Sequence, residues 1–161
     1  MPIRDLSAAD APRCDEIIAA LPTFFGVESG IQACAEAVRT QRGWAAELDG
    51  VVVGFLTVEQ LINPEISWMA VHPAHRHCGF GKALVSAAVD ALVADGCTLL
   101  TVLTLGPSVV EKCADNYAGT RRFYRSVGFQ AVRELDLADW EYPALLMSRQ
   151  LRQPRSTVVN G

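Results

Sequence analysis

The sequence lacks several features that would indicate other classes of protein. No apolar run reaches the roughly 18 residues that a membrane-spanning helix needs, and lysine occurs only at Lys82 and Lys112. The 18 acidic residues outnumber the 14 lysines and arginines, which gives a formal net charge of -4. A nucleic-acid-binding domain usually carries a basic face, which this balance does not favour. We therefore expect neither a membrane nor a nucleic acid as a partner.

Paired cysteines are also missing. The five cysteines are an odd number without a CxxC pair, which predicts reduced thiols and not a disulfide framework. The first residues lack the pattern of a secretory signal peptide, so we expect a cytoplasmic protein. His72, His75, His77 and Cys78 stand close together, but a structural zinc site usually adds a second ligand pair elsewhere. The sequence shows no such pair, and we expect no metal.

The length and composition of the chain suffice for one folded domain. The chain has 161 residues, of which 50% are hydrophobic and 20% are charged, so it can bury a sizeable core. No internal repeat, low-complexity segment or linker interrupts it. We predict a single domain over residues 1–152, followed by a flexible polar tail over residues 153–161.

A glycine-containing turn is the feature around which the sequence is arranged. It reads HPAHRHCGFGK over residues 72–82, between an apolar strand-like run and an alanine-rich helical pattern. Such a turn aims main-chain N–H groups and a helix N-terminus at one place, which suits a phosphate. Gly79 and Gly81 permit a tight bend and a close approach, and Arg76 and Lys82 add positive charge. The alternative is an ordinary turn whose glycines serve packing.

Two common phosphate-binding loops do not fit this turn. A P-loop needs GxxxxGK[ST], which no glycine here begins. A dinucleotide fingerprint needs GxGxxG, but Leu84 stands where the third glycine belongs. What remains is Arg-x-x-Gly-x-Gly, from Arg76 to Gly81, directly after a strand.

A second group of residues lies on the helix predicted over residues 117–127. Asn116, Thr120 and Tyr124 are four residues apart and share one helical face. The same segment contains Phe-Tyr-x-x-x-Gly-Phe, from Phe123 to Phe129. Considered alone, this pattern fits a half-buried amphipathic helix whose tyrosine hydroxyls reach water.

The predicted elements make an α+β domain. Asp49-Gly50 between apolar runs indicates a hairpin, and the order strand, helix, strand over residues 65–105 predicts a right-handed parallel crossover. The expected sheet is mixed and mostly antiparallel, with flanking helices, and residues 109–115 fit either a loop or a helical turn. Strands are expected over residues 3–6, 43–48, 51–60, 65–71, 98–105, 129–137 and 143–151, and helices over residues 7–21, 31–40, 81–94 and 117–127.

Together, the Arg-x-x-Gly-x-Gly turn and the Phe-Tyr-x-x-x-Gly-Phe helix resemble the GNAT superfamily of N-acetyltransferases. The order of elements is similar from about residue 3 to residue 151. The resemblance implies an α/β three-layer fold and acetyl-CoA as cosubstrate. It also implies that acetyl passes to a primary amine by direct attack in a ternary complex. The partner would be a small-molecule or peptide amine, and a homodimer is common in the superfamily.

The resemblance also assigns roles to residues. The pyrophosphate of acetyl-CoA is expected on the main-chain amides of the turn, and the pantetheine arm along the end of the preceding strand. Tyr124 takes the position of the general acid that protonates the leaving thiolate. Many relatives place an asparagine seven residues before this tyrosine, whereas here Tyr117 holds that position. The expected cofactor-binding residues are Met69, Ala70, Val71, Arg76, His77, Cys78, Gly79, Phe80, Gly81, Lys82, Asn116 and Tyr117.

Glu65 is the candidate general base. A carboxylate at the start of this strand matches the base position in some superfamily members. Strict alternation along the strand places it on one face with Ser67, Met69 and Val71. The alternatives are Glu59, His72 and a water-relayed proton path.

Two other functions fit the same residues. The chain could be a catalytically silent acyl-CoA-binding sensor or interaction module, or it could bind nucleotide phosphates. The acceptor amine cannot be read from the sequence. Its walls are expected in residues 22–31, 60–64 and 106–115, where Phe24, Phe25 and nearby acidic residues favour an amine with an apolar body.

Overall fold

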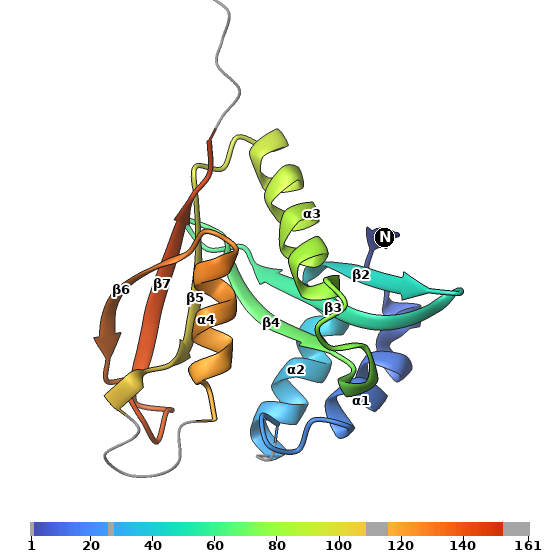
Figure 1. Cartoon of the computed structure of the whole chain (residues 1–161), viewed down its shortest axis with the longest axis horizontal. Helices are drawn as coiled ribbons and strands as arrows, with labels where there is room; N and C mark the ends of the chain where they lie inside the picture. The colour runs from blue at the N-terminus through green and yellow to red at the C-terminus, as the bar shows by residue number, and fades with distance from the viewer. Residues whose placement is uncertain (1, 26–27, 109–115, 153–161) are drawn as a thin grey trace, which may run out of the picture.

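A seven-stranded sheet runs through the molecule, with the unit β4–α3–β5 at its middle (Figure 1). The computed structural model describes residues 2–25, 28–108 and 116–152. The strands are β1 (Ile3–Asp5), β2 (Arg42–Leu48), β3 (Val51–Glu59), β4 (Glu65–Val71), β5 (Leu99–Leu105), β6 (Gln130–Leu135) and β7 (Ala144–Gln150). The helices are η1 (Ala8–Asp10), α1 (Ala11–Ala19), α2 (Glu28–Thr40), η2 (Pro73–His75), α3 (Phe80–Ala94) and α4 (Ala118–Ser126), of which η1 and η2 are short 3-10 turns.

The order of strands is β1-β2-β3-β4-β5-β7-β6, and every neighbouring pair is antiparallel except β4 and β5. These two run parallel, as the predicted crossover requires. They pair only at Glu65 with Thr101 and at Ile66 with Val102. Figure 1 shows β4 running obliquely away from β5 beyond that point. The sheet is therefore split between its fourth and fifth strands.

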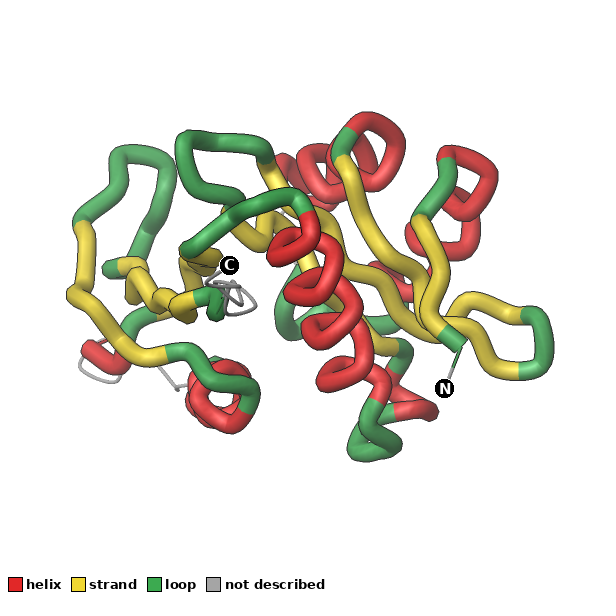
Figure 2. Tube along the Cα trace, turned by 90° about the horizontal axis from the view of Figure 1, so that it is seen from above, coloured by secondary structure: helices red, strands yellow, loops and turns green. Residues whose placement is uncertain are grey.

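Two apolar clusters cover the two faces of the sheet, and Figure 2 shows helices on both sides of the strands. Leu84 of α3 and Tyr124 of α4 belong to the first cluster. Ile17 of α1 and Cys34 of α2 belong to the second cluster. The predicted fold class, a mixed and mostly antiparallel sheet flanked by helices, is confirmed.

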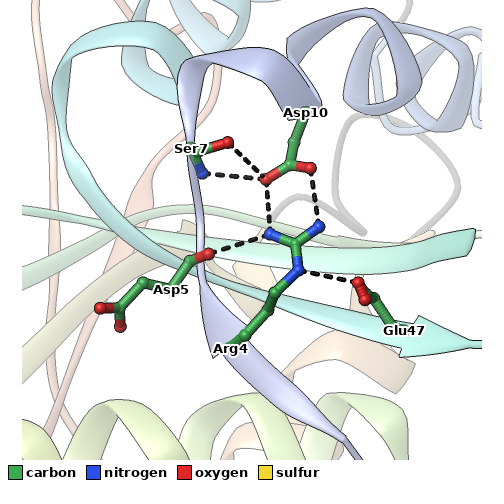
Figure 3. A network of polar contacts seen from close by, with 5 residues as sticks. All are labelled: Arg4, Asp5, Ser7, Asp10 and Glu47. Carbon is green, nitrogen blue, oxygen red and sulfur yellow. Dashed lines mark hydrogen bonds and ion pairs between the residues drawn. The ribbon is translucent and has the colours of Figure 1, made fainter. Parts of the chain in front are cut away.

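An ion-pair network fastens the first strand to the rest of the sheet (Figure 3). The Arg4 guanidinium donates two hydrogen bonds of 2.8 Å to the Asp10 carboxylate and one of 2.8 Å to Glu47 on β2. The main-chain N–H of Ser7 also donates to Asp10, over 2.9 Å. Its hydrogen bonds with Arg4, opposed by burial, lower the pKa of Asp10 from 3.8 to about 2. This network joins β1, β2 and the start of α1.

The observed elements differ from the predicted ones mainly at their ends. Helix α2 begins at Glu28, three residues before its predicted start, and so contains Gly30. A Cβ on Gly30 would meet nothing within 4 Å, and an acidic residue in the first turn stabilises the helix dipole. Strand β6 ends at Leu135, two residues early.

Two segments named in the sequence analysis, residues 109–115 and the tail over residues 153–161, lie outside the described residues. The single-domain boundary at residue 152 stays a prediction. Within the described ranges, no helix is both long and apolar enough to cross a membrane.

Candidate active site

A cavity of about 1230 Å3 occupies the split between β4 and β5. Its walls come from both strands, from the turn before α3, from α4 and from the chain after α1. Tyr124 belongs to the apolar cluster on one face of the sheet, and Trp68 packs against the cluster on the other. Both residues line the cavity, so the split lets one cavity reach both faces. Every predicted site residue except Cys78 lies on its wall.

One end of the cavity combines main-chain N–H groups of a helix N-terminus with positively charged side chains. His77 and Gly79 adopt positive φ angles of 60° and 84°, which bend the chain sharply into α3. The N-terminus of α3 carries no side-chain cap and no acidic residue in its first turn, so its N–H groups stay available. Arg76 and Lys82 belong to this turn and line the cavity, as does Arg122 of α4, which the sequence did not indicate as a site residue. This arrangement suits phosphate groups.

Gly81 has a packing role that the sequence left as an alternative. A Cβ at this position would lie 3.2 Å from two ring atoms of Phe123. The missing side chain therefore allows α3 to pack closely against α4. Cys78 is exposed, and its thiol hydrogen-bonds to the Arg76 carbonyl over 3.4 Å. A contact from the Cys78 main-chain amide stays a prediction.

The edge of β4 beyond Ile66 faces the cavity without a partner from β5. Met69, Ala70 and Val71 line this part of the cavity, and all three pair with β3 on their other side. An unpaired edge offers main-chain N–H and C=O groups to an extended ligand. An arm containing amide groups could bind there as an added strand.

Tyr124 lines the cavity and is almost fully buried. The side chain is 5% exposed, and the rings of Phe123 and Phe129 hold it at centroid distances of 5.3 and 5.4 Å. Within the described residues, no hydrogen bond occupies its hydroxyl. Burial raises the pKa of Tyr124 well above its usual value. The group therefore stays protonated at neutral pH and can act as a proton donor.

Glu65 does not share a face with Met69 and Val71, so that part of the prediction was wrong. The ladder between β3 and β4 shifts so that Thr57 pairs with Trp68 and Val58 with Ile66. Ser67 is the extra residue of this β-bulge, and a bulge interrupts strict alternation. Ile66, Met69 and Val71 consequently lie on the α3 and α4 face. Glu65, next to Ile66, lies on the face of α1 and α2.

The carboxylate of Glu65 is held from β5. The Thr101 hydroxyl donates a hydrogen bond of 2.7 Å to Oε2 of Glu65. The bulge itself is held by a hydrogen bond of 2.8 Å between the hydroxyls of Thr57 and Ser67. The Ser67 hydroxyl also donates a hydrogen bond to the side-chain carbonyl oxygen of Gln41. Sequence reasoning missed Thr101, because nothing in the sequence shows which strand will lie beside Glu65.

Phe24 links the anion end of the cavity to its other walls. The Tyr117 hydroxyl donates a hydrogen bond of 3.2 Å to the Phe24 carbonyl, and the two rings meet edge-on at 5.2 Å. The guanidinium carbon of Arg76 lies 5.4 Å from the centre of the Phe24 ring. Asn116 is exposed and lines the cavity. Three segments distant in sequence therefore meet around one aromatic ring.

The predicted acceptor walls are present in part. Phe24 and Phe25 of the predicted wall 22–31 line the cavity. No residue of the predicted wall 60–64 and none of the described residues 106–108 lines it, although the neighbouring Glu59, Glu65 and Leu105 do. Trp140 adds a wall that the sequence did not indicate. Residues 109–115 lie outside the described part of the chain. In the described ranges, no three His, Cys, Asp or Glu side chains gather into a metal-binding group.

Comparisons with known proteins agree with this geometry. Residues 39–131 match the family model described as an acetyltransferase (GNAT) domain. A GNAT-family protein from Desulfovibrio desulfuricans, 21% identical, superposes with a TM-score of 0.79 over 94% of this chain and 99% of that one. The ribosomal-protein-S18-alanine N-acetyltransferase of Escherichia coli, 18% identical, gives a TM-score of 0.74 over 98% of this chain and 97% of that one.

A third solved structure contains a ligand. It is an aminoglycoside 6'-N-acetyltransferase complexed with coenzyme A, 17% identical, with a TM-score of 0.71 over 96% of this chain and 99% of that one. No curated protein matches the sequence. The family model covers more than half of the chain, from the end of α2 to the start of β6. On this evidence, the chain belongs to the GNAT family of acetyltransferases.

Proposed function

We propose that this protein is an acetyl-CoA-dependent N-acetyltransferase that moves an acetyl group to a primary amine in a ternary complex. One observation carries the proposal. A single cavity connects an anion-binding helix N-terminus, an unpaired strand edge, a buried protonated tyrosine and a carboxylate. These are the groups that acetyl transfer from a thioester to an amine requires. The solved relative complexed with coenzyme A supports the choice of cosubstrate.

The chain would bind acetyl-CoA mostly with main-chain groups. The amides from Arg76 to Lys82 receive the pyrophosphate, and the positive charge of Arg76, Lys82 and Arg122 adds to the attraction. The β4 edge from Met69 to Val71 pairs with the pantetheine arm. Phosphates and arm together bring the thioester to the split in the sheet, beside Tyr124.

The reaction would then proceed without a covalent enzyme intermediate. Glu65, directly or through a water, takes a proton from the bound ammonium. The neutral amine forms a bond to the thioester carbonyl carbon, and a main-chain N–H of β4 stabilises the negative charge that develops on the carbonyl oxygen. The carbon–sulfur bond breaks, and the Tyr124 hydroxyl gives its proton to the leaving thiolate. The nitrogen releases its second proton, through water, to the Tyr124 phenolate, which restores the hydroxyl, and Glu65 returns its proton to solvent. The products are the acetylated amine and free CoA.

We also propose that residues 1–152 form one catalytic domain that acts in the cytoplasm. The acceptor is a small-molecule or peptide amine, and the chain works alone or as a homodimer.

Thermal melting with acetyl-CoA, CoA and ATP in parallel tests ligand binding first. A ligand that binds only the folded state raises the melting temperature. We expect acetyl-CoA and CoA to raise it and ATP to leave it unchanged. A screen for thiol release over a panel of amines then tests turnover. A stabilising shift without turnover of any amine would instead identify an acyl-CoA-binding sensor, and a shift with ATP alone would identify a nucleotide-phosphate site.

A further inference from the structure

Two carboxylates are paired across the strands where the cavity adjoins the loop over residues 60–64, a part that we call the acceptor end. Glu59 on β3 and Glu65 on β4 are direct cross-strand partners, and both line the cavity. Like charges in this position repel each other and destabilise a sheet. In the described part of the chain, neither carboxylate forms an ion pair with a cationic side chain. A positively charged ligand group between them would relieve the repulsion.

An aromatic wall stands on the same face of the sheet. Phe25 and Trp68 lie with ring centroids 5.8 Å apart and planes inclined by 38°. Trp68 shares the α1 and α2 face with Glu65, because the bulge at Ser67 shifts the alternation of side chains between them. Both aromatic side chains are only partly buried, and both line the cavity. They offer an apolar aromatic surface on the same face of the sheet as the two carboxylates.

The charges of the cavity are divided between its ends. The described arginine and lysine residues on its wall are Arg76 in the turn before α3, Lys82 at the start of α3 and Arg122 on α4. The described residues at the acceptor end contribute carboxylates and aromatic rings. A carboxylate on the acceptor would therefore meet repulsion and find no cationic partner among them.

We propose that the acceptor is a cationic amine that carries an aromatic or similarly flat apolar group and no carboxylate beside its amine. This inference rests on the proposed function and identifies the acceptor class. The ammonium lies between Glu59 and Glu65, and the apolar group stacks on Phe25 and Trp68. Thr101 occupies Oε2 of Glu65, which leaves Oε1 to receive the ammonium proton. Glu59 binds the acceptor without taking its proton.

Three matched acceptors test the class. The assay measures thiol release from acetyl-CoA with 2-phenylethylamine, with L-phenylalanine, and with n-butylamine. The first two differ by the carboxylate, and the first and third differ by the ring. We expect kcat/KM for 2-phenylethylamine to exceed each of the others by roughly tenfold or more. Equal values for any of the pairs would overturn the acceptor class, while turnover itself would still support an acetyltransferase.

Variants of Glu59, Trp68 and Phe25 test whether these residues produce the preference for 2-phenylethylamine. E59Q should raise KM for 2-phenylethylamine by roughly tenfold at nearly unchanged kcat and weaken the discrimination against L-phenylalanine. W68L and F25L should each reduce the preference for 2-phenylethylamine over n-butylamine. F25L serves if W68L does not fold, since Phe25 lies outside the strands. E36Q, which removes an exposed carboxylate of α2 away from the cavity, is the matched control.

The outcomes distinguish a failure of the acetyltransferase function from a failure of the acceptor class alone. If acetyl-CoA stabilises the protein and no amine of a wide panel releases thiol, the proposed function fails together with the acceptor class. If amines are acetylated and E59Q behaves as E36Q does, the acceptor class alone fails. Retained melting temperature and an unchanged shift with acetyl-CoA show that each variant is folded and binds its cosubstrate.

Discussion

The two ends of the cavity are built from different parts of the polypeptide. At the anion end, main-chain N–H groups at the start of α3 are available, and the side chains around them mainly add charge. At the proposed acceptor end, the wall consists of side chains, among them Glu59, Glu65 and Trp68 on the two strands beside the bulge. Main-chain sites need a particular backbone shape, whereas side-chain sites need particular residues. On the proposed function, the first kind of site serves any acceptor, whereas the second kind determines which acceptor binds.

The split between β4 and β5 is what brings the two ends together. The β5 and β7 ladder has seven paired positions, whereas β4 and β5 share two. If β4 and β5 paired along their whole length, the two strands would occupy the space of the cavity. The molecule thus gives up hydrogen bonds between two central strands, and those main-chain groups become available to a ligand.

The largest expected effect comes from Y124F, which acts between the two ends. Removing the hydroxyl should lower kcat by roughly 100-fold, because the leaving thiolate loses its proton donor. The affinity for acetyl-CoA should stay nearly unchanged, since the aromatic packing is kept. Steady-state kinetics with melting shifts measure both. Y142F, at a tyrosine outside the cavity wall, is the control, and an unchanged kcat in Y124F would remove Tyr124 from the mechanism.

The anion end can be altered alone through its main chain. In G79A, a residue with φ of 84° gains a Cβ, which costs about 1–2 kcal/mol in the left-handed region and shifts the turn. We expect acetyl-CoA to bind roughly tenfold more weakly, as measured by calorimetric titration. G96A provides the matched control, because Gly96 has φ of 85° and open space around it. Equal acetyl-CoA affinity in both folded variants would refute the phosphate turn.

The acceptor end can be altered alone at Thr101. T101V removes the hydrogen bond to Oε2 of Glu65 and should lower kcat by roughly fivefold to tenfold, because the carboxylate loses its orientation. T101S keeps a hydroxyl and should restore most of the rate. KM for acetyl-CoA should not change in either variant. If T101V and T101S are equally active in kinetic assays, Thr101 does not position Glu65.

The smallest effect concerns stability far from both ends. The folded-state pKa of Asp10 lies at about 2, below the ordinary 3.8. Its ion pair therefore adds stability above pH 3.8, and that contribution is lost as the pH falls toward 2. We expect roughly 1 kcal/mol, a value reduced because Arg4 is 42% exposed. Urea unfolding of wild type and D10N from pH 6 to pH 2.5 should show a smaller acid loss in D10N, and parallel pH curves would contradict this.

Most of the fold could be predicted because its signals are local. The two residues of the hairpin, Asp49 and Gly50, both have positive φ, as the dipeptide indicated. Strand β4 has the predicted bounds, and α3 starts one residue before the predicted position. The start of α2 was missed because Gly30 breaks a helix pattern on paper but lies unhindered in its first turn.

The candidate site, like the fold, could be predicted only where its signals are local in the sequence. The sequence alone identified the turn from Arg76 to Lys82 and the helix carrying Tyr124, because a sharp bend needs glycine and the motif spacing is short. The face of Glu65, its hydrogen bond with Thr101 and the facing of Glu59 and Glu65 came only from the tertiary structure. They depend on a bulge and on which strands lie side by side. Such contacts join residues far apart in the chain, and local patterns carry no record of them.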